Sequence, residues 1–325
     1  MKAFIGIDVG GTKTLGVAID ERGKVLKKSL STAANYQAVG LKEASRVISL
    51  VMSELKEAVK NTNADIAACA YGMSGLDRPM DEIRLRALLK DIHPGVPMVL
   101  VNDAFLLLRA GTQDGVGVAV VSGTGSNSVG RGYDGKMFRI GGLCYEMGDA
   151  GSGWDIAVEG LRAAKRGSDG RAPGTVINDL MLEEFGLRHV DDAMDFLLDG
   201  QDPAPFYYRM TPLIFRAAAQ GDLVARKILI DAGQELGNSV SIVAGRFFGY
   251  NDRFDCVLGG SVMLSETTSI MRKALELELH KHFPNAVISR IPCQPVCGAL
   301  LMAADLMLKR DRVLELQKVL INQLP

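Results

Sequence analysis

The chain has 325 residues, of which 47% are hydrophobic and 23% are charged. This length is long for one hydrophobic core, so we expect two domains of about 150 residues each, and the apolar content argues against intrinsic disorder. The 37 Lys and Arg residues balance the 38 Asp and Glu residues almost completely, and no long basic run stands out, which argues against a nucleic-acid partner.

Two further features indicate the compartment. The chain reaches Asp8 before the apolar region of a signal peptide can develop, and no later stretch of about 20 residues is apolar throughout. We therefore expect a cytoplasmic protein without a membrane partner. The cysteines are odd in number and stand in dissimilar surroundings, which is typical of reduced thiols. They are Cys69, Cys144, Cys256, Cys293 and Cys297.

The first hundred residues predict an alternation of strands and helices. Strands expected at 2–9, 14–20 and 24–30 form a β-meander. A helix follows from Leu41, because apolar residues recur there at three- and four-residue spacing. The next expected elements are a strand near 66–71, a helix near 81–90, a strand at 98–101 and a helix from Ala104. Such an alternation is typical of an α/β layer.

The pattern restarts at Gly115. A strand at 116–121 is expected to enter a second glycine-rich turn, and another strand follows from Asn127. The later expected elements are helices from about 154 to 248, a strand at 255–258, and helices near Glu266 to Thr267 and from Ala299. The repetition predicts two similar α/β domains around a cleft. They are residues 1–114 and residues 115–305 with a helical insertion, and a last helix at about 306–325 is expected to pack back on the first domain.

A glycine-rich turn between the first two strands has the chemistry of a phosphate-binding loop. Gly10 and Gly11 let backbone N–H groups point at an anion without interference from a Cβ atom. The side chains of Thr12, Lys13 and Thr14 can reach phosphate oxygens. In a Walker loop the lysine comes one residue earlier and a helix follows, so that motif does not fit. The remaining alternative is an ordinary hairpin turn.

The second glycine-rich turn repeats this device between strands of the second half. Its predicted phosphate-binding residues are Gly123, Thr124, Gly125 and Ser126. Two such loops facing each other would clamp one nucleotide and couple its binding to domain closure, which excludes water from phosphoryl transfer. The pair favours a nucleotide site over two unrelated hairpins.

A third glycine-rich turn ends the strand at 255–258. Gly259, Gly260 and Ser261 are small enough to admit the base or ribose of a nucleotide. A strand-to-helix turn with two glycines is common. The prediction of an adenosine site therefore depends on the order of this turn after the two phosphate loops.

Three carboxylates carry the expected chemistry. Asp8, at the end of the first strand, is placed to hold hydrated Mg²⁺. Asp103 follows the strand at 98–101, and we predict that it is the general base that accepts a hydroxyl proton, a role typically worth about 10² to 10⁴ in rate. The alternative is that Asp103 only caps the helix from Ala104. The turn at 148–153 can present Asp149 to sugar hydroxyls beside a helix N-terminus.

The ordered motifs resemble those of the N-acetylglucosamine kinase and BadF-type ATPase family, within the actin, hexokinase and Hsp70 superfamily. The resemblance covers nearly the whole chain. Its motifs are Asp8-Val-Gly-Gly-Thr-Lys-Thr14, Ala34-Asn35-Tyr36, Gly72-Met73-Ser74-Gly75, Asn102-Asp103, Ser122-Gly-Thr-Gly-Ser-Asn127, Gly148-Asp149 and Leu258-Gly-Gly-Ser261. The resemblance implies two actin-like, ribonuclease H-like domains, each with a mixed β-sheet flanked by helices, around a nucleotide and sugar cleft.

The resemblance also implies an activity. It is that of a phosphotransferase with an alcohol acceptor, which moves the γ-phosphate of Mg-ATP to a hydroxyl, expected to be the 6-hydroxyl, of N-acetylglucosamine or a related amino sugar or hexose. Asp103 is then the catalytic base and Asp8 holds Mg²⁺ through water. A homodimer is expected. The implied substrate contacts are Asn35, Ser74, Gly75, Asn102, Asp103, Thr124, Asn127 and Asp149.

The chain departs from the amino-sugar kinases at two places. Where these often read Gly-Gly-Trp-Gly before a Gly-Asp-Glu-Gly turn, this chain reads Gly-Gly-Leu-Cys at 141–144 and Gly-Asp-Ala-Gly at 148–151. The substituent at the sugar's second carbon is therefore left open. Glucose, glucosamine, N-acetylglucosamine, N-acetylmannosamine and muramic acid derivatives all stay in consideration.

Two other functions use similar motifs. An activator ATPase of an acyl-CoA dehydratase or reductase would need cysteines for a bridging iron–sulfur cluster, whereas Cys144 and Cys256 stand alone in apolar or glycine-rich settings. A non-catalytic sugar sensor should lack the base or one phosphate loop, and this chain has both. Both alternatives are weaker than the kinase interpretation.

Overall fold

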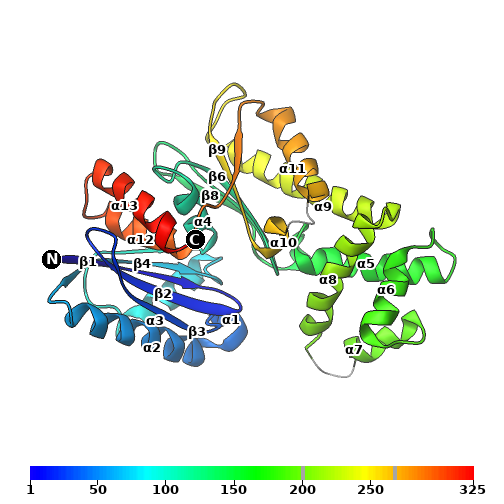
Figure 1. Ribbon diagram of the computed structural model, residues 1–325, viewed down its shortest axis with the longest axis horizontal. Helices are drawn as coiled ribbons and strands as arrows, with labels where there is room; N and C mark the ends of the chain where they lie inside the picture. The colour runs from blue at the N-terminus through cyan, green and yellow to red at the C-terminus, as the bar shows by residue number, and fades with distance from the viewer. Residues whose placement is uncertain (199–201, 266–268) are drawn as a thin grey trace. The chain divides into compact units, whose positions relative to one another are not determined.

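The computed structural model describes residues 1–198, 202–265 and 269–325 (Figure 1). The chain divides into two compact units. The first consists of residues 1–119, 133–135 and 289–325, and the second of residues 120–132 and 136–288. The strands form two five-stranded sheets. The predicted α/β fold with two sheet-containing units is thereby confirmed.

The first sheet has the strand order β3-β2-β1-β4-β5. Its meander consists of β1 (Lys2–Val9), β2 (Lys13–Asp20) and β3 (Val25–Thr32), which pair antiparallel. β4 (Asp65–Met73) and β5 (Met98–Val101) continue the sheet in parallel to β1. The sheet is therefore mixed, and the carboxyl ends of β1, β4 and β5 meet at one edge, where ligands bind in open α/β sheets.

Glycines set the close approach of helices to both faces of this sheet. A Cβ atom on Gly16 would lie 2.4 Å from Val51 of α2 (Leu41–Lys60). On the opposite face, a Cβ atom on Gly6 would lie 2.8 Å from the backbone nitrogen of Leu300 in α12 (Val296–Asp305). Figure 1 shows α2 and α12 on the two sides of the sheet. Larger residues at either glycine would push a helix off the sheet.

The C-terminal segment belongs to the first unit. The amide of Gln317 in α13 (Arg310–Gln323) donates to the carbonyl oxygens of Ala110 at 3.1 Å and Thr112 at 2.9 Å. In α4 (Ala104–Gly111) the buried guanidinium of Arg109 donates to Asp305 of α12 at 2.7 and 3.0 Å. Two further helices of this unit are short, α1 (Tyr36–Val39) and α3 (Pro79–Leu89).

The second sheet has the order β10-β9-β6-β7-β8. Its strands are β6 (Gly117–Ser122), β7 (Ser126–Arg131), β8 (Met137–Gly141), β9 (Asp255–Gly259) and β10 (Val287–Arg290). Sequence patterns did not predict β8 and β10. Both are short edge strands without a fully buried residue, so neither has the apolar alternation that marks a strand in a sequence.

Helices make up most of the second unit between β8 and β9, as expected. They are the 3₁₀ helices η1 (Tyr145–Met147) and η2 (Val190–Ala193) and the α-helices α5 (Gly153–Ser168), α6 (Val176–Phe185), α7 (Met194–Leu198), α8 (Ala204–Ala219) and α9 (Leu223–Ala244). After β9 come α10 (Ser261–Leu264) and α11 (Ser269–His282). The helix start expected near Glu266 to Thr267 lies outside the described residues.

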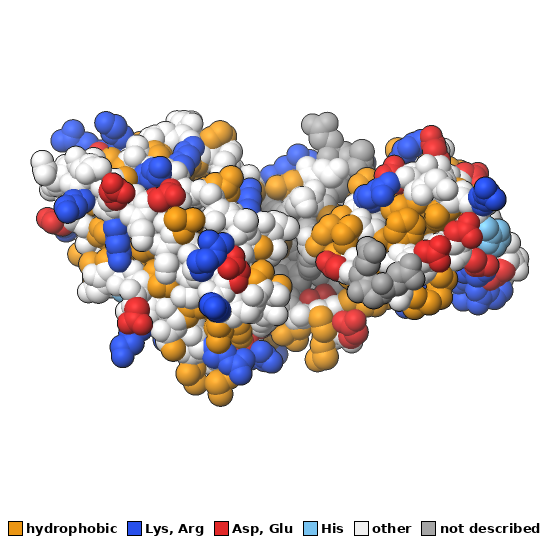
Figure 2. All heavy atoms as spheres, turned by 90° about the horizontal axis from the view of Figure 1, so that it is seen from below, with side chains coloured by type: hydrophobic (Ala, Val, Ile, Leu, Met, Phe, Trp, Pro, Cys, Tyr) orange, Lys and Arg blue, Asp and Glu red, His pale blue; other side chains and the backbone are white. Residues whose placement is uncertain are grey.

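Surface charge follows the balanced composition. Side chains of both signs occur on both units in the face drawn in Figure 2. Across the ranges 1–198, 202–265 and 269–325, the helices are too short or too polar to cross a lipid bilayer.

Candidate active site

The predicted base and the predicted metal-binding carboxylate lie on neighbouring strands of the first unit. Asp8 of β1 is in register with Gly72 of β4, which is in register with Val101 of β5, two residues before Asp103. A Cβ atom on Gly72 would lie 2.2 Å from Leu106 of α4. Residues in register on adjacent strands share a face, so Asp8 lies on the α4 side of the sheet.

The two carboxylates influence each other's charge. The pKa of Asp8 is raised from 3.8 to about 7. Burial is the largest cause, and the negative charge of Asp103 adds to it, whereas the Lys13 ammonium lowers the pKa. Two carboxylates held together in this way attract a cation, which would stabilise both in the ionised form.

The same pair fits Mg²⁺ better than a metal held by protein ligands alone. Among the residues that the structure describes, no group of three or more His, Cys, Asp or Glu side chains could hold a metal ion. Mg²⁺ is usually bound by one or two carboxylates, several waters and substrate phosphates. Asp8 is the carboxylate that the sequence predicts to take part in such a set.

Helix capping does not explain Asp103. Its side chain makes no capping hydrogen bond to α4. Instead, Asn102 Oδ1 accepts the Ala104 N–H at 3.1 Å. The side-chain bond to the first N–H of α4 is therefore made by Asn102, and the role of Asp103 as the general base stays a prediction.

Only some of the predicted phosphate-binding residues of the first glycine-rich turn are exposed. The Gly10 N–H donates to the Lys13 carbonyl at 2.9 Å and closes the turn, and Gly11, Thr12 and Lys13 are exposed. Thr14 is fully buried and pairs with Val9, which places its side chain on the α2 face of the sheet, opposite Asp8. The structure therefore groups Gly11, Thr12 and Lys13 for a phosphate and does not bring the Thr14 hydroxyl to them.

The substrate residues predicted in the first unit lie together. Asn35 donates through Nδ2 to Ser74 Oγ at 3.2 Å and accepts the Gln37 N–H at 3.0 Å, which starts α1. Gly75 has a φ of +86°, and a Cβ atom there would lie 2.4 Å from Asn35 Oδ1. Asn102 donates to the carbonyl of Leu76, 3.4 Å away. These polar groups and Asp103 therefore come from adjoining segments.

Three glycine-rich segments of the second unit also come together. A Cβ atom on Gly260, whose φ is +90°, would lie 2.2 Å from the Ser122 carbonyl oxygen. The Gly153 N–H at the start of α5 donates to the Gly123 carbonyl at 2.7 Å. The predicted adenosine turn, the second phosphate loop and the N-terminus of α5 are therefore neighbours, which only residues without side chains permit.

Within the second phosphate loop, the serine hydroxyls face inward. Ser122 Oγ donates to the Gly151 carbonyl at 2.6 Å and Ser126 Oγ donates to the Ala150 carbonyl at 2.7 Å. Thr124 and Gly125 are exposed. The serines thus fix the loop to the turn at 148–153, and Thr124 and Gly125 are the members presented to a ligand.

Asp149 lies beside Asn127, as a shared role in substrate binding requires. Its carboxylate is largely buried and accepts the Leu143 N–H at 2.8 Å. A Cβ atom on Gly141 would lie 3.3 Å from Asp149 Oδ1, and one on Gly142 would lie 2.6 Å from Asn127 Nδ2. Asp149 therefore holds the turn at 141–143 in place next to Asn127, in addition to any contact with substrate.

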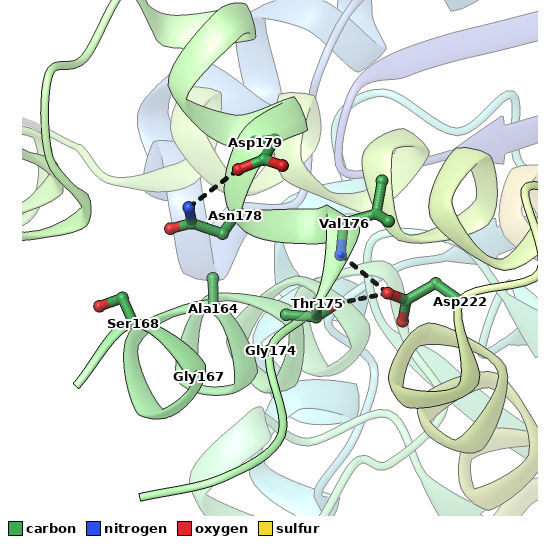
Figure 3. A pocket seen from close by; sticks show the side chains of 9 residues that line it. All are labelled: Ala164, Gly167, Ser168, Gly174, Thr175, Val176, Asn178, Asp179 and Asp222. Carbon is green, nitrogen blue, oxygen red and sulfur yellow. Dashed lines mark hydrogen bonds between the residues drawn. The ribbon is translucent and has the colours of Figure 1, made fainter. Parts of the chain in front are cut away.

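A separate cavity of about 430 Å³ lies among the helices of the second unit (Figure 3). None of the predicted site residues lines it. Asp222 accepts the Thr175 hydroxyl at 3.0 Å and the Val176 N–H at 2.8 Å, so it already satisfies the N-terminus of α6. The cavity is unrelated to the site predicted from the sequence.

The cysteines differ in their exposure to solvent. Cys144 is exposed, whereas the other cysteines are buried, and all are free thiols. Burial raises the pKa of the Cys256 thiol to about 12, so it is protonated at neutral pH.

Comparison with known proteins identifies the family of this chain. The model of the BadF/BadG/BcrA/BcrD ATPase family matches residues 5–303, and the chain belongs to this family. The resemblance seen in the sequence motifs is confirmed.

Two curated relatives match over almost their full lengths. The N-acetyl-D-glucosamine kinase of Dictyostelium discoideum is 31% identical over 314 residues, which cover 93% of this chain and 98% of the relative. The N-acetylmuramic acid/N-acetylglucosamine kinase of Clostridium acetobutylicum is 28% identical, with the same coverage of 93% and 98%.

Solved structures share the fold. One from Chromobacterium violaceum superposes with a TM-score of 0.68 at 21% identity, covering 93% of this chain and 99% of its own. A ROK family glucokinase from Streptomyces griseus, solved with glucose and AMPPNP, has a TM-score of 0.54 at 18% identity over 93% of this chain and 99% of its own. At these identities the likeness concerns the fold alone.

Proposed function

We propose that this chain is an ATP-dependent sugar kinase that transfers the γ-phosphate of Mg-ATP to a hydroxyl, expected to be the 6-hydroxyl, of N-acetylglucosamine or a related amino sugar or hexose. The observation that carries the proposal is the placement of Asp8 and Asp103 together at the carboxyl edge of the first sheet, beside Asn35, Ser74 and Gly75. The kinase relatives, one of them 31% identical over 93% of the chain, support the sugar as acceptor.

Asp103 is the general base. As the sugar oxygen forms its bond to the γ-phosphorus, its proton passes to the Asp103 carboxylate, and the bond from the γ-phosphorus to the β–γ bridging oxygen breaks to release ADP. Asp8 would hold Mg²⁺, expected through water, and such an ion would supply positive charge to the phosphates. The exposed Lys13 ammonium adds positive charge beside Asp8.

The glycine-rich turns bind the nucleotide. The proposed phosphate contacts are the exposed residues Gly11, Thr12 and Lys13 in the first unit and Thr124 and Gly125 in the second, with the backbone N–H groups as the main donors. The other predicted loop residues, Gly10, Thr14, Gly123 and Ser126, shape the two turns. Gly259 to Ser261 flank adenosine. The packing of Gly260 on Ser122 supports this, because it keeps the adenosine turn next to the second phosphate loop.

The residues proposed to contact the sugar are grouped by unit. Asn35, Ser74, Gly75 and Asn102 act in the first unit, and a second group acts in the other. That group is Thr124, Asn127 and Asp149. The candidate acceptors are glucose, glucosamine, N-acetylglucosamine, N-acetylmannosamine and muramic acid derivatives. A cytoplasmic location and a homodimer are part of the proposal.

The decisive experiment measures ADP release with Mg-ATP against a panel of these sugars, with a sugar-free reaction as the blank. We expect at least one amino sugar to raise turnover well above the blank, and chelation of Mg²⁺ to abolish it. The proposal fails if every sugar gives the blank rate. Sugar-independent ATP hydrolysis by a coloured protein would instead support the activator ATPase.

A further inference from the structure

A fully buried carboxylate in the first unit gathers donors from two separate segments. Asp81, in the first turn of α3, has no exposed side-chain surface. It accepts the N–H groups of Asp77 at 3.1 Å and Arg78 at 2.8 Å, the Arg78 guanidinium at 2.9 Å, and the hydroxyl of Tyr36. Gln37 Nε2 lies 3.4 Å from the same carboxylate.

Only some of these donors are explained by helix capping. At the start of α3, Asp81 accepts the Arg78 N–H, as the side chain at the third helical position does in a capping box. Tyr36 and Gln37 belong to α1, and Tyr36 is 45 residues away in the sequence. A carboxylate that served the helix alone would need neither of them.

The α1 contacts join the two segments that carry the predicted acceptor residues. Gln37 Nε2 also donates to the Gly75 carbonyl at 3.0 Å and to Asp77 Oδ2 at 3.1 Å. Asn35 donates to Ser74 Oγ at 3.2 Å. Residues 35–37 and 74–78 are therefore fixed to each other by several hydrogen bonds that meet at Asp81.

The network continues to the base. Asp77 Oδ1 accepts Asn102 Nδ2 at 3.2 Å, and Asn102 Oδ1 in turn accepts the Ala104 N–H at 3.1 Å. Asp103 lies between these two residues in the chain. A series of hydrogen bonds thus leads from Asp81 through Asp77 to the side chain of Asn102 and the backbone N–H of Ala104, the two neighbours of Asp103 in the chain.

We propose that Asp81, together with Tyr36, is a positioning centre for the acceptor sugar: it fixes Asn35, Ser74 and Gly75 relative to Asp103 without touching the substrate. This inference rests on the proposed sugar kinase function.

The charge of Asp81 is part of this role. Burial raises the pKa of Asp81, but hydrogen bonds from Arg78, Tyr36 and two backbone N–H groups outweigh burial and hold the pKa well below its ordinary value. The carboxylate is therefore ionised throughout the neutral range. An amide in its place would keep the shape but lose the charge and turn an N–H group toward other donors.

The test compares Tyr36→Phe, Asp81→Asn and the control Glu82→Gln in steady-state kinetics. Tyr36→Phe removes one cross-link from α1 and leaves the capping box of α3 intact. Glu82 shares the first turn of α3 but is exposed and pairs only with Arg86 among the described contacts. We expect the sugar KM to rise about 10-fold in Asp81→Asn and about 3-fold in Tyr36→Phe, while the ATP KM stays within about 2-fold and the control is unchanged.

A second measurement separates positioning from general stability. In amide hydrogen exchange, both test variants should speed exchange in residues 34–40 and 74–78, while residues 2–9 of β1 keep their wild-type protection. Tyr36→Phe carries the test if Asp81→Asn does not fold.

The outcomes are distinct. If the wild-type enzyme is active, two results would overturn the positioning role alone. One is a sugar KM that is unchanged in both variants, and the other is an equal rise of the sugar KM and the ATP KM. A wild-type protein without sugar-dependent turnover would overturn the proposed function, and the inference with it.

Discussion

The predicted site residues of the two units are held in place by different kinds of contact. In the first unit the contacts are mainly between side chains: Asp8 and Asp103 share one edge of the sheet, and Asn35 donates a hydrogen bond to Ser74. In the second unit, backbone approaches backbone, as where Gly260 packs against Ser122. Substitutions that keep size but change charge should therefore act mainly in the first unit, and substitutions that add a single methyl group should act mainly in the second.

The largest effect is expected from Asp103→Asn. Loss of the base should lower kcat by about 10² to 10⁴, while ATP binding is retained because the phosphate loops are untouched. Phosphorylated sugar is measured by single-turnover assay and ATP binding by calorimetry. Asp311→Asn, at an exposed position on α13, is the matched control. Wild-type turnover in Asp103→Asn would remove this residue from the role of base.

Next comes the steric test of the second unit. Gly260→Ala should lower the free energy of unfolding by about 1–3 kcal/mol, because the backbone conformation at this position is one that only glycine adopts readily and the methyl group meets Ser122. Denaturant unfolding measures the change. At Gly125 a Cβ atom meets nothing within 4 Å and φ is not positive, so Gly125→Ala should leave stability unchanged. Equal stability of the two variants would contradict the idea that close backbone packing holds the second unit's loops in place.

The charge test of the first unit uses pH. Because the pKa of Asp8 is raised from 3.8 in the unfolded chain to about 7 in the folded one, the folded protein binds the extra proton between these values. This group therefore makes stability fall as pH rises from about 4 to about 7. Unfolding of the metal-free protein should show that Asp8→Asn removes this part of the pH dependence and stabilises the protein at pH 8.

Activity should change in the opposite direction. The ionised form of Asp8 is the one that attracts Mg²⁺, so kcat/KM for Mg-ATP should rise from about pH 6, reach half its maximum near pH 7 and level off above about pH 8. A flat profile from pH 5 to 9 would separate Asp8 from the metal.

The smallest effect concerns Thr14. Its hydroxyl is buried on the α2 face and finds no hydrogen-bond partner among the described residues. Thr14→Val should therefore leave stability unchanged or raise it by about 1 kcal/mol, with the ATP KM unaltered. Thr12→Val, at an exposed position in the same turn, should raise the ATP KM. A higher ATP KM in Thr14→Val would show that the hydroxyl does reach a phosphate.

Local sequence predicted the elements with strong patterns. The strands at 2–9 and 98–101 were placed at the bounds that the structure has, because apolar runs there end at turn residues. β8 and β10 were missed because short strands at a sheet edge bury too little to leave a pattern. The order β9-β6 could not be derived either, since it pairs segments far apart in the chain.

The candidate site was predictable to the same degree. Glycine-rich turns are recognisable because few residues tolerate their backbone conformations. Asp81 was predicted only to begin a helix, since its bond to Tyr36 depends on how α1 and α3 meet in the fold. The cap of α4 was an open question between function and structure, and only coordinates assign it to Asn102.

The packing of α12 against Gly6 also bears on how the protein is made. The second unit occupies an almost continuous stretch ending at residue 288, whereas the first unit needs residues 289–325 to cover β1. During synthesis, the second unit can reach its final structure while the first sheet still lacks a helix on one face. The N-terminal strands, although translated first, are therefore expected to be the last part of the chain to become resistant to proteolysis.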